Sequence, residues 1–250
     1  TITFIEGKNF KNIIGTSSSN GILLVCNALV FGFIIFYSIN YLISHLTLEK
    51  SQTPSQFIFK TIIFVAIMNS SIWLCSEIIN IVSIITEIII GIGEKLFNTK
   101  ISFSNFVTVI NKEVYISNKE FNMFSFEGVV KSFTSVGFMN LIFTYSLRYI
   151  LVQVFVIIAP FAILSLTLDK TSWFFKVWLR IFMSLLLEQI LIAVILLLAF
   201  SIEGQRNSDF VQLLYTGVIY ALTSTNTYMR QLFGGISTSV SSSFGKLLKN

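Results

Sequence analysis

The residues best suited to catalysis or metal binding are few in this sequence and form no familiar motif. His45 is the only histidine, and the two cysteines, Cys26 and Cys75, match the spacing of neither a zinc site nor a disulfide framework. With one histidine and no G-x-S-x-G sequence, the usual hydrolytic triad has no members. A glycine-rich phosphate loop is also missing from the sequence. We therefore predict no enzymatic activity, no cofactor and no metal site, and we interpret His45 as a contact with lipid headgroups.

A second set of polar residues interrupts long apolar runs: Arg148, Gln153, Glu188 and Gln189. A charge at the centre of a bilayer costs about 2.5–3.5 kcal/mol, so such side chains should face protein or water. At a rise of about 1.5 Å per residue, Arg148 and Glu77 reach similar depths. Gln153 and Glu188 both come near the middle of the membrane. We predict two packing pairs, Arg148 with Glu77 and Gln153 with Glu188, which either hold the helices together or line a conduit.

Polar residues also recur at helical spacing in a stretch otherwise filled by isoleucine. They are Ser76, Glu77, Asn80, Ser83, Glu87 and Glu94. Spacings of three, four and seven residues place such side chains on one face of a helix. This stripe could line an aqueous lumen, face a polar partner, or be the wet side of a helix that lies partly outside the bilayer.

The composition indicates that the helices carrying these residues lie in a membrane. Of the 250 residues, 54% are hydrophobic and 12% are charged, whereas soluble domains carry about 25% charged residues. The mean hydropathy is +0.80. The net charge of +5 comes from scattered single cations, which favours orientation signals over sequence-specific binding of nucleic acid.

Five apolar segments are long enough, or nearly so, to cross the hydrocarbon layer, which takes about 20 residues. They are residues 21–46, 57–93, 139–168, 181–202 and 210–229. The predicted fold is therefore all-α: one polytopic membrane domain over residues 1–250 with about five transmembrane helices.

Three of these segments have features of their own. The first is too long for the apolar core of a cleavable signal, so it is expected to be retained. The second exceeds the bilayer thickness, so it either tilts or breaks near Asn69-Ser70-Ser71. In the third, Pro160 removes a backbone hydrogen bond and is expected to kink the helix.

Residues 98–138 form the one long segment that is not expected to span. Residues 106–109 and 114–116 flank Asn111-Lys112 and predict a short hairpin. The aromatic-rich stretch 121–133 is compatible with a helix, and its aromatic content predicts packing against a surface.

A basic, tryptophan-containing loop is expected before the fourth span. Its residues Trp173, Lys176, Trp178 and Arg180 are typical of an anchor at headgroup level, which the positive-inside rule places in the cytoplasm. The loop charges then predict an external segment 98–138, an external N-terminus and a cytosolic tail, 230–250.

Three short sequences resemble those of TrbL-type conjugal transfer proteins, polytopic inner-membrane subunits of type IV secretion machines. They are Ala159-Pro160 near the end of one span, K-x-W-L-R at 176–180, and R-x-x-x-G-G at Arg230, Gly234 and Gly235. The resemblance covers about residues 139 to 240. It implies a subunit of a bacterial cytoplasmic membrane that assembles with its own copies and with other subunits, including separate ATPases, around a translocation path.

Two other classes of membrane protein fit the hydrophobicity. A secondary transporter needs a midplane site, often on broken helices and repeated halves, and the sequence has no evident repeat. An autonomous, holin-like pore former would not require the basic anchor or the external segment.

Overall fold

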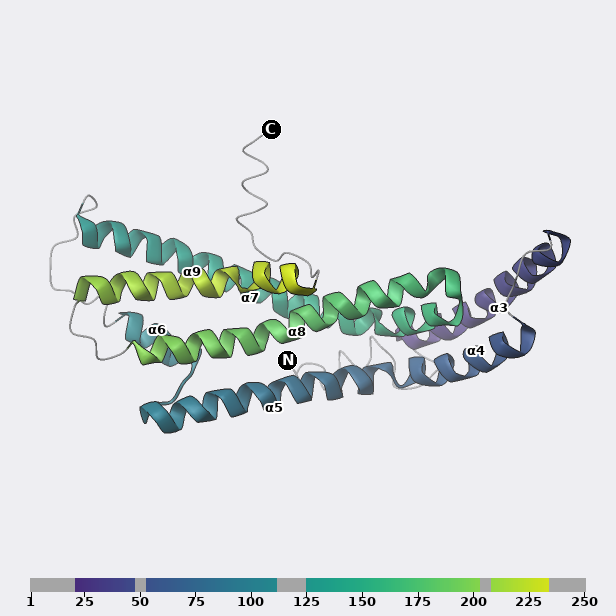
Figure 1. Cartoon of the computed structure of the whole chain (residues 1–250), viewed down its shortest axis with the longest axis horizontal. Coiled ribbons are helices and arrows are strands. Elements are labelled where there is room, and N and C mark those ends of the chain that lie inside the picture. Colours follow the sequence, from purple (N-terminus) through teal and green to yellow (C-terminus); the bar gives the residue numbers. More distant parts are fainter. Residues whose placement is uncertain (1–20, 48–52, 112–124, 203–207, 234–250) are drawn as a thin grey trace, which may run out of the picture. The chain divides into compact units, whose positions relative to one another are not determined.

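The computed structural model describes residues 21–47, 53–111, 125–202 and 208–233, and within these ranges every regular element is a helix (Figure 1). The α-helices are α3 (Gly21–Thr47), α4 (Pro54–Asn69), α5 (Ser71–Phe97), α6 (Phe103–Ile110), α7 (Phe126–Leu164), α8 (Ser172–Ser201) and α9 (Ser208–Phe233). Two short 3-10 helices, η2 (Ser165–Thr167) and η3 (Asp169–Thr171), join α7 to α8. The predicted all-α fold is confirmed.

Four of the helical segments are long and apolar enough to cross a membrane: Gly21–Ser44, Ser71–Phe97, Phe126–Thr167 and Ser172–Ser201. Large apolar side chains such as Phe31, Ile62 and Ile88 are exposed along the helices. A surface of this kind is stable against lipid and unfavourable in water. The chain is a multi-pass membrane protein.

The helix α4 is apolar but has only 16 residues. Its length is about 24 Å at 1.5 Å per residue, which is shorter than a hydrocarbon layer of about 30 Å. Of the two alternatives for the second predicted span, the structure shows the break, since α4 ends at Asn69 and α5 begins at Ser71. At the break, the Asn69 side chain donates to the Val65 carbonyl, and the Ser70 amide bonds to the carbonyls of Ala66 and Ile67.

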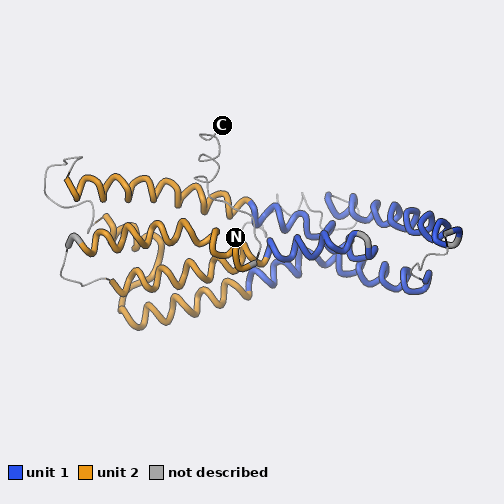
Figure 2. Tube along the Cα trace, turned by 45° about the horizontal axis from the view of Figure 1, so that its top comes forward, with its two compact units in different colours: residues 1–80, 151–182 blue, residues 81–150, 183–250 orange. Residues whose placement is uncertain are grey.

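The chain divides into two compact units, coloured blue and orange in Figure 2: residues 1–80 with 151–182, and residues 81–150 with 183–250. We call them unit 1 and unit 2. The division falls within the helices α5, α7 and α8. The single membrane domain predicted for residues 1–250 stays a prediction.

Unit 1 has a small core in which α3 and α4 pack against the end of α7. Its buried residues are Cys26, Met68, Ile163 and Leu164. Tyr37 stacks on Phe57 with ring centroids 3.8 Å apart. Lys60 on α4 forms an ion pair with Asp169 in η3, at 2.9 Å.

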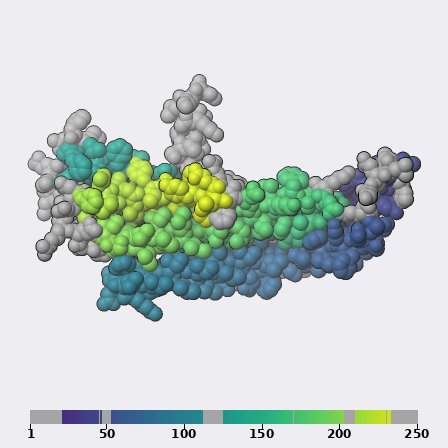
Figure 3. All heavy atoms as spheres, in the orientation of Figure 1, coloured from purple at the N-terminus to yellow at the C-terminus, as the bar shows by residue number. Residues whose placement is uncertain are grey.

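Unit 2 has a larger core, to which α5, α6, α7, α8 and α9 contribute. Its buried residues are Ile101, Phe106, Ile110, Leu141, Leu196, Ala199, Phe200, Val211, Tyr215, Ile219 and Leu222. At Gly137 the helices α7 and α9 approach so closely that an added Cβ atom would lie 2.8 Å from Ile219 Cγ2. The space-filling view shows atoms of α9 lying directly against those of α8 (Figure 3).

The predicted hairpin is wrong in its first half, because residues 106–109 lie in the helix α6. The Ser102 side chain caps this helix by accepting a hydrogen bond from the Asn105 amide at 3.1 Å. Phe106 and Ile110 lie one turn apart and are both buried. This burial stabilises a helix despite the β-branched residues between them. Residues 114–116 lie outside the described residues.

The starts of two helices and the position of Pro160 within its helix also differ from expectation. Helix α7 begins at Phe126 and not at 139, so residues 126–138 are helical and continuous with the third predicted span; their external location stays a prediction. Helix α8 begins at Ser172, so most of the predicted loop 169–180 is helical. Pro160 lies inside α7, only four residues before its end at Leu164, so any bend it causes affects the last turn and not the middle of the span.

Candidate functional site

The interior of unit 2 holds a charged pair between α7 and α8. Arg148 Nε lies 3.6 Å from Glu188 Oε2. The same Nε donates to the Leu185 carbonyl at 3.0 Å, and Nη2 lies 3.5 Å from Gln189 Oε1. The Glu188 residue is 0% exposed. Because a lone buried charge is strongly unfavourable, each of the two groups depends on the other.

Helix α9 contacts Glu188 from another side. Thr225 Oγ1 donates to Glu188 Oε1 at 3.3 Å, and Asn226 Nδ2 donates to Oε2 at 3.4 Å. Both side chains are buried. Glu188 therefore accepts hydrogen bonds from α9 and pairs with a cation on α7, so this one carboxylate connects three helices. We call Arg148, Glu188, Gln189, Thr225 and Asn226 the polar cluster.

The α7–α9 register brings further hydroxyl groups to the same level. Thr134 bonds to Thr216 at 2.8 Å, and Gly137 packs on Ile219; both pairs are 82 residues apart (216 − 134 and 219 − 137). An equal offset at two points means that the two helices run parallel. One turn beyond Leu141, this offset places Thr144 level with Asn226. Thr144 Oγ1 is buried, and no partner for it exists among the described residues.

The structure corrects the two predicted packing pairs. The acidic partner of Arg148 is Glu188, whereas Glu77 is an exposed residue of α5. The partners of Glu188 are Arg148, Thr225 and Asn226, and not Gln153. Gln153 Nε2 is buried, and it has no hydrogen-bond partner within the described part of the chain.

Sequence reasoning identified three members of the polar cluster, Arg148, Glu188 and Gln189, and missed the two on α9. The available signal was the content of threonine, serine and asparagine in residues 210–229. It indicates a helix that faces protein more than lipid, but it does not select Thr225 and Asn226 from their neighbours.

The polar stripe predicted on α5 lies at the edge of the buried face of that helix. Glu77, Asn80 and Glu87 are exposed, while Ser76, Ser83 and Glu94 are partly buried. The buried face is formed by Cys75, Ile79, Val82, Thr86 and Gly93. Among the described residues, no hydrogen-bonding or ionic partner is found for the carboxylates of Glu77 and Glu87.

The predicted headgroup anchor divides into two parts. Trp173 is 62% exposed, and Lys176 and Arg180 are exposed as well. Trp178 is 5% exposed; its Nε1 donates to the Phe155 carbonyl at 2.9 Å, and its ring stacks on Phe182 with centroids 5.3 Å apart. The assignment of Trp178 as an interface anchor is therefore wrong, because it is a core residue of unit 1 that holds α8 to α7.

Some predicted residues cannot be placed. The side chains of His45 and Arg230 lie outside the described residues, and so do Gly234 and Gly235. Cys26 and Cys75 are buried free thiols. Within the described ranges, no three His, Cys, Asp or Glu side chains are grouped in a way that could hold a metal ion.

Comparison of the chain with protein-family models, curated proteins and solved structures gives no match.

Proposed function

We propose that this chain is a subunit of a type IV secretion or conjugation machine in a bacterial cytoplasmic membrane. In this proposal it acts by assembly and not by catalysis: copies of the chain associate with one another and with other subunits and form part of a translocation path. The energy for transfer would come from separate ATPases.

The observation that carries the proposal is the exposed part of the polar stripe on α5. Glu87 follows the start of α5 at Ser71 by 16 residues and precedes its end at Phe97 by 10, which is about 24 Å and 15 Å along the helix. It is therefore far from both ends of a helix long enough to span. An exposed carboxylate at such a depth costs about 2.5–3.5 kcal/mol against lipid, and contact with another subunit or with water removes that cost.

The resemblance of residues 139–240 to TrbL-type proteins supports the identity of the machine. Ala159-Pro160 lies near the end of α7, and the basic sequence 176–180 lies within the first turns of α8. By the positive-inside rule these turns are cytoplasmic, as are the residues after α9. The N-terminus and the segment before α7 are then external.

The first test is the transfer frequency of a marked mobile element from a donor that lacks the gene. A loss of transfer that is restored by the wild-type gene supports the proposal. Unchanged transfer, with the deletion confirmed, contradicts a role in conjugation.

A second test concerns the stripe itself. Replacing Asn80 and Glu87 by leucine removes polar groups that lipid disfavours, so a chain that faced lipid there would be unaffected or stabilised. If the stripe contacts other subunits or water, the variant inserts at normal levels but no longer restores transfer, and cross-linked oligomers decrease. The matched control is Ile81→Leu with Ile88→Leu, two exposed apolar positions on the same helix, which should restore transfer fully.

A further inference from the structure

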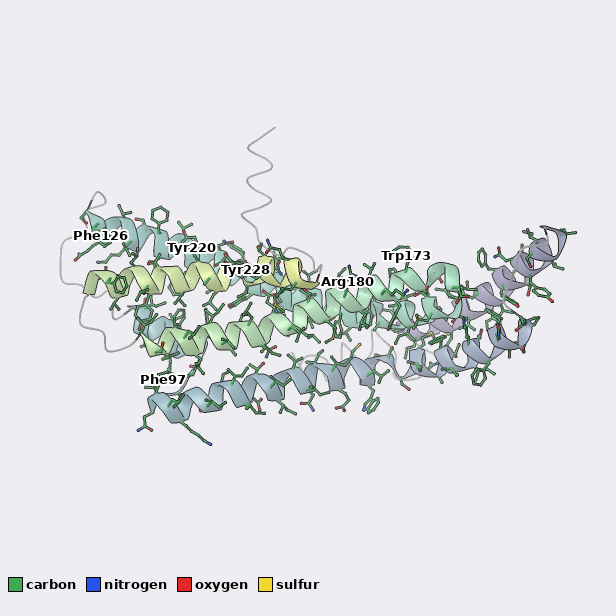
Figure 4. All side chains as sticks on the ribbon, viewed as in Figure 1. Phe97, Phe126, Trp173, Arg180, Tyr220 and Tyr228 are labelled. Atoms are coloured by element: carbon green, nitrogen blue, oxygen red, sulfur yellow. The ribbon has the colours of Figure 1, made fainter. Side chains whose placement is uncertain are left out.

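The first turns of α8 carry an exposed face with two cations and one tryptophan. Trp173, Lys176 and Arg180 are three and seven residues apart, and at about 100° per residue they share one side of the helix. Val177, which is also exposed, lies between them. In Figure 4 the labelled Trp173 and Arg180 both project from α8. We call these four residues the cationic face; all of them belong to unit 1.

The two cations have no partner among the described residues. Lys176 and Arg180 are four residues apart, a spacing at which like charges on a helix repel each other. The nearest acids along the chain are already paired, Asp169 with Lys60 at 2.9 Å and Glu188 with Arg148 at 3.6 Å. An anion close to both side chains would remove this repulsion and gain from both charges.

The length of α8 indicates that the two cations lie close to the phosphate groups of the lipids. After Arg180 the helix continues for 21 residues, from Ile181 to Ser201, or about 31 Å. This matches a hydrocarbon layer about 30 Å thick, and Glu188, the one charge in the stretch, is buried against α7 and α9. Residues 172–180 then extend into the headgroup region, where the phosphates of the lipids lie.

We propose that the cationic face binds the phosphate group of an anionic phospholipid. Arg180 donates two parallel N–H groups to the phosphate oxygens, and Lys176 supplies a second positive charge one turn away. Trp173 sits at the interface with its indole N–H towards the headgroup, and Val177 contacts the upper part of the acyl chains. The two cations favour an anionic lipid over a zwitterionic one.

The test measures lipids retained by the purified full-length protein, using native mass spectrometry with phosphatidylglycerol and phosphatidylcholine in equal amounts. We expect the wild type to retain phosphatidylglycerol preferentially. The variant K176Q/R180Q should lose this preference, by roughly fivefold for each cation removed. The control K95Q/K100Q also removes two exposed cations and should retain phosphatidylglycerol like the wild type.

A charge-conserving variant and a check of folding serve as controls. Lys176→Arg keeps the charge and should keep the preference, and helical content measured by circular dichroism should be equal in all variants. Equal retention of the two lipids by the wild type, or equal losses in the test and control variants, would overturn the proposal. The measurement uses purified protein, so its outcome is independent of whether the chain takes part in transfer.

Discussion

Glu188 is the central residue of the polar cluster. Its carboxylate pairs with Arg148 and accepts hydrogen bonds from Thr225 and Asn226. The ion pair of Arg148 with Glu188 need not stabilise the fold by itself, since the desolvation of two charges offsets much of their attraction. The fold loses stability when one partner is removed, because the other charge then stays buried without a counter-charge. Arg148 and Glu188 should therefore be strongly coupled.

We predict that Glu188→Leu or Arg148→Met alone lowers the free energy of unfolding by about 3–5 kcal/mol, whereas the double variant loses much less. The measurement is a double-mutant cycle by unfolding in mixed micelles. As a control, Glu77→Leu should change stability little, because Glu77 is exposed. Its combination with Arg148→Met should be additive. Additive effects of Arg148→Met and Glu188→Leu would contradict the pairing.

The two tryptophans of α8 are predicted to behave differently. Trp178→Phe keeps the stacking on Phe182 but loses the hydrogen bond to the Phe155 carbonyl, which should cost about 1 kcal/mol. Trp173→Phe changes an exposed side chain and should leave the unfolding free energy nearly unchanged. Similar losses in both variants, measured by thermal unfolding in one detergent, would argue against a core role specific to Trp178.

At this scale the sequence indicates that Arg148 and Glu188 need partners, but not which ones. The cost of a buried charge follows from residue type alone. Partner choice depends on the start of each helix and on its rotation. The predicted depths assumed an unbroken second span from residue 57 and a third beginning at 139, whereas α5 begins at Ser71 and α7 at Phe126. A shift of 13 residues in a helix start, from 139 to 126, amounts to about 20 Å, which is enough to change the pairing.

Among the elements, α9 buries polar side chains next to the apolar ones that it contributes to the core of unit 2. Its buried side chains include Gln212, Thr216, Thr223, Thr225 and Asn226, while Phe210, Leu213, Tyr220, Tyr228 and Leu232 are exposed. The threonine hydroxyls can bond to carbonyls of their own helix, as those of Thr216 and Thr223 do. A helix with polar groups turned inwards presents an apolar surface outwards. This arrangement suits a fifth span although its average hydropathy is low.

The contact between α7 and α9 depends on the absence of a side chain at Gly137. Because a Cβ atom there would lie 2.8 Å from Ile219 Cγ2, we predict that Gly137→Val separates the helices and lowers the unfolding free energy by about 1–3 kcal/mol. The control is Gly217→Val on α9, where a Cβ atom meets nothing within 4 Å. That variant should be neutral. Equal stability of the two variants would contradict close packing at Gly137.

Apolar length predicted the positions of α3, α7, α8 and α9, because the bilayer dictates how long a span must be, whereas the one predicted span 57–93 corresponds to the two helices α4 and α5. Their ends were harder to predict. A helix continues beyond the apolar stretch wherever its polar turns can still pack or be solvated, as in residues 126–138 of α7 and 172–180 of α8. The hairpin prediction is wrong because the three- and four-residue spacing of Phe103, Phe106 and Ile110, which buries one face of a helix, outweighs the β-branched content of residues 106–109.

For the molecule as a whole, the number of membrane crossings depends on whether α9 spans the bilayer. Four helical segments are long and apolar enough, and α9 is a candidate fifth span because its outward face is apolar. Loop charges predict that the start of α8 is cytoplasmic and the end of α5 is external. If α9 crosses, its end returns to the cytoplasmic side.

We therefore predict the labelling of three single cysteines, Lys100→Cys, Lys176→Cys and Gln231→Cys, each at an exposed position and each in a chain whose Cys26 and Cys75 are replaced by alanine. A membrane-impermeant maleimide added to intact spheroplasts should label only position 100, because the proposed topology places positions 176 and 231 on the cytoplasmic side. Permeabilised cells should show all three labelled, which controls for reactivity.

Labelling of 231 together with 100 in intact spheroplasts would mean that α9 does not cross and that the chain has an even number of spans between these two positions. Labelling of 176 from outside would reverse the orientation and, with it, the leaflet in which the cationic face meets its lipid.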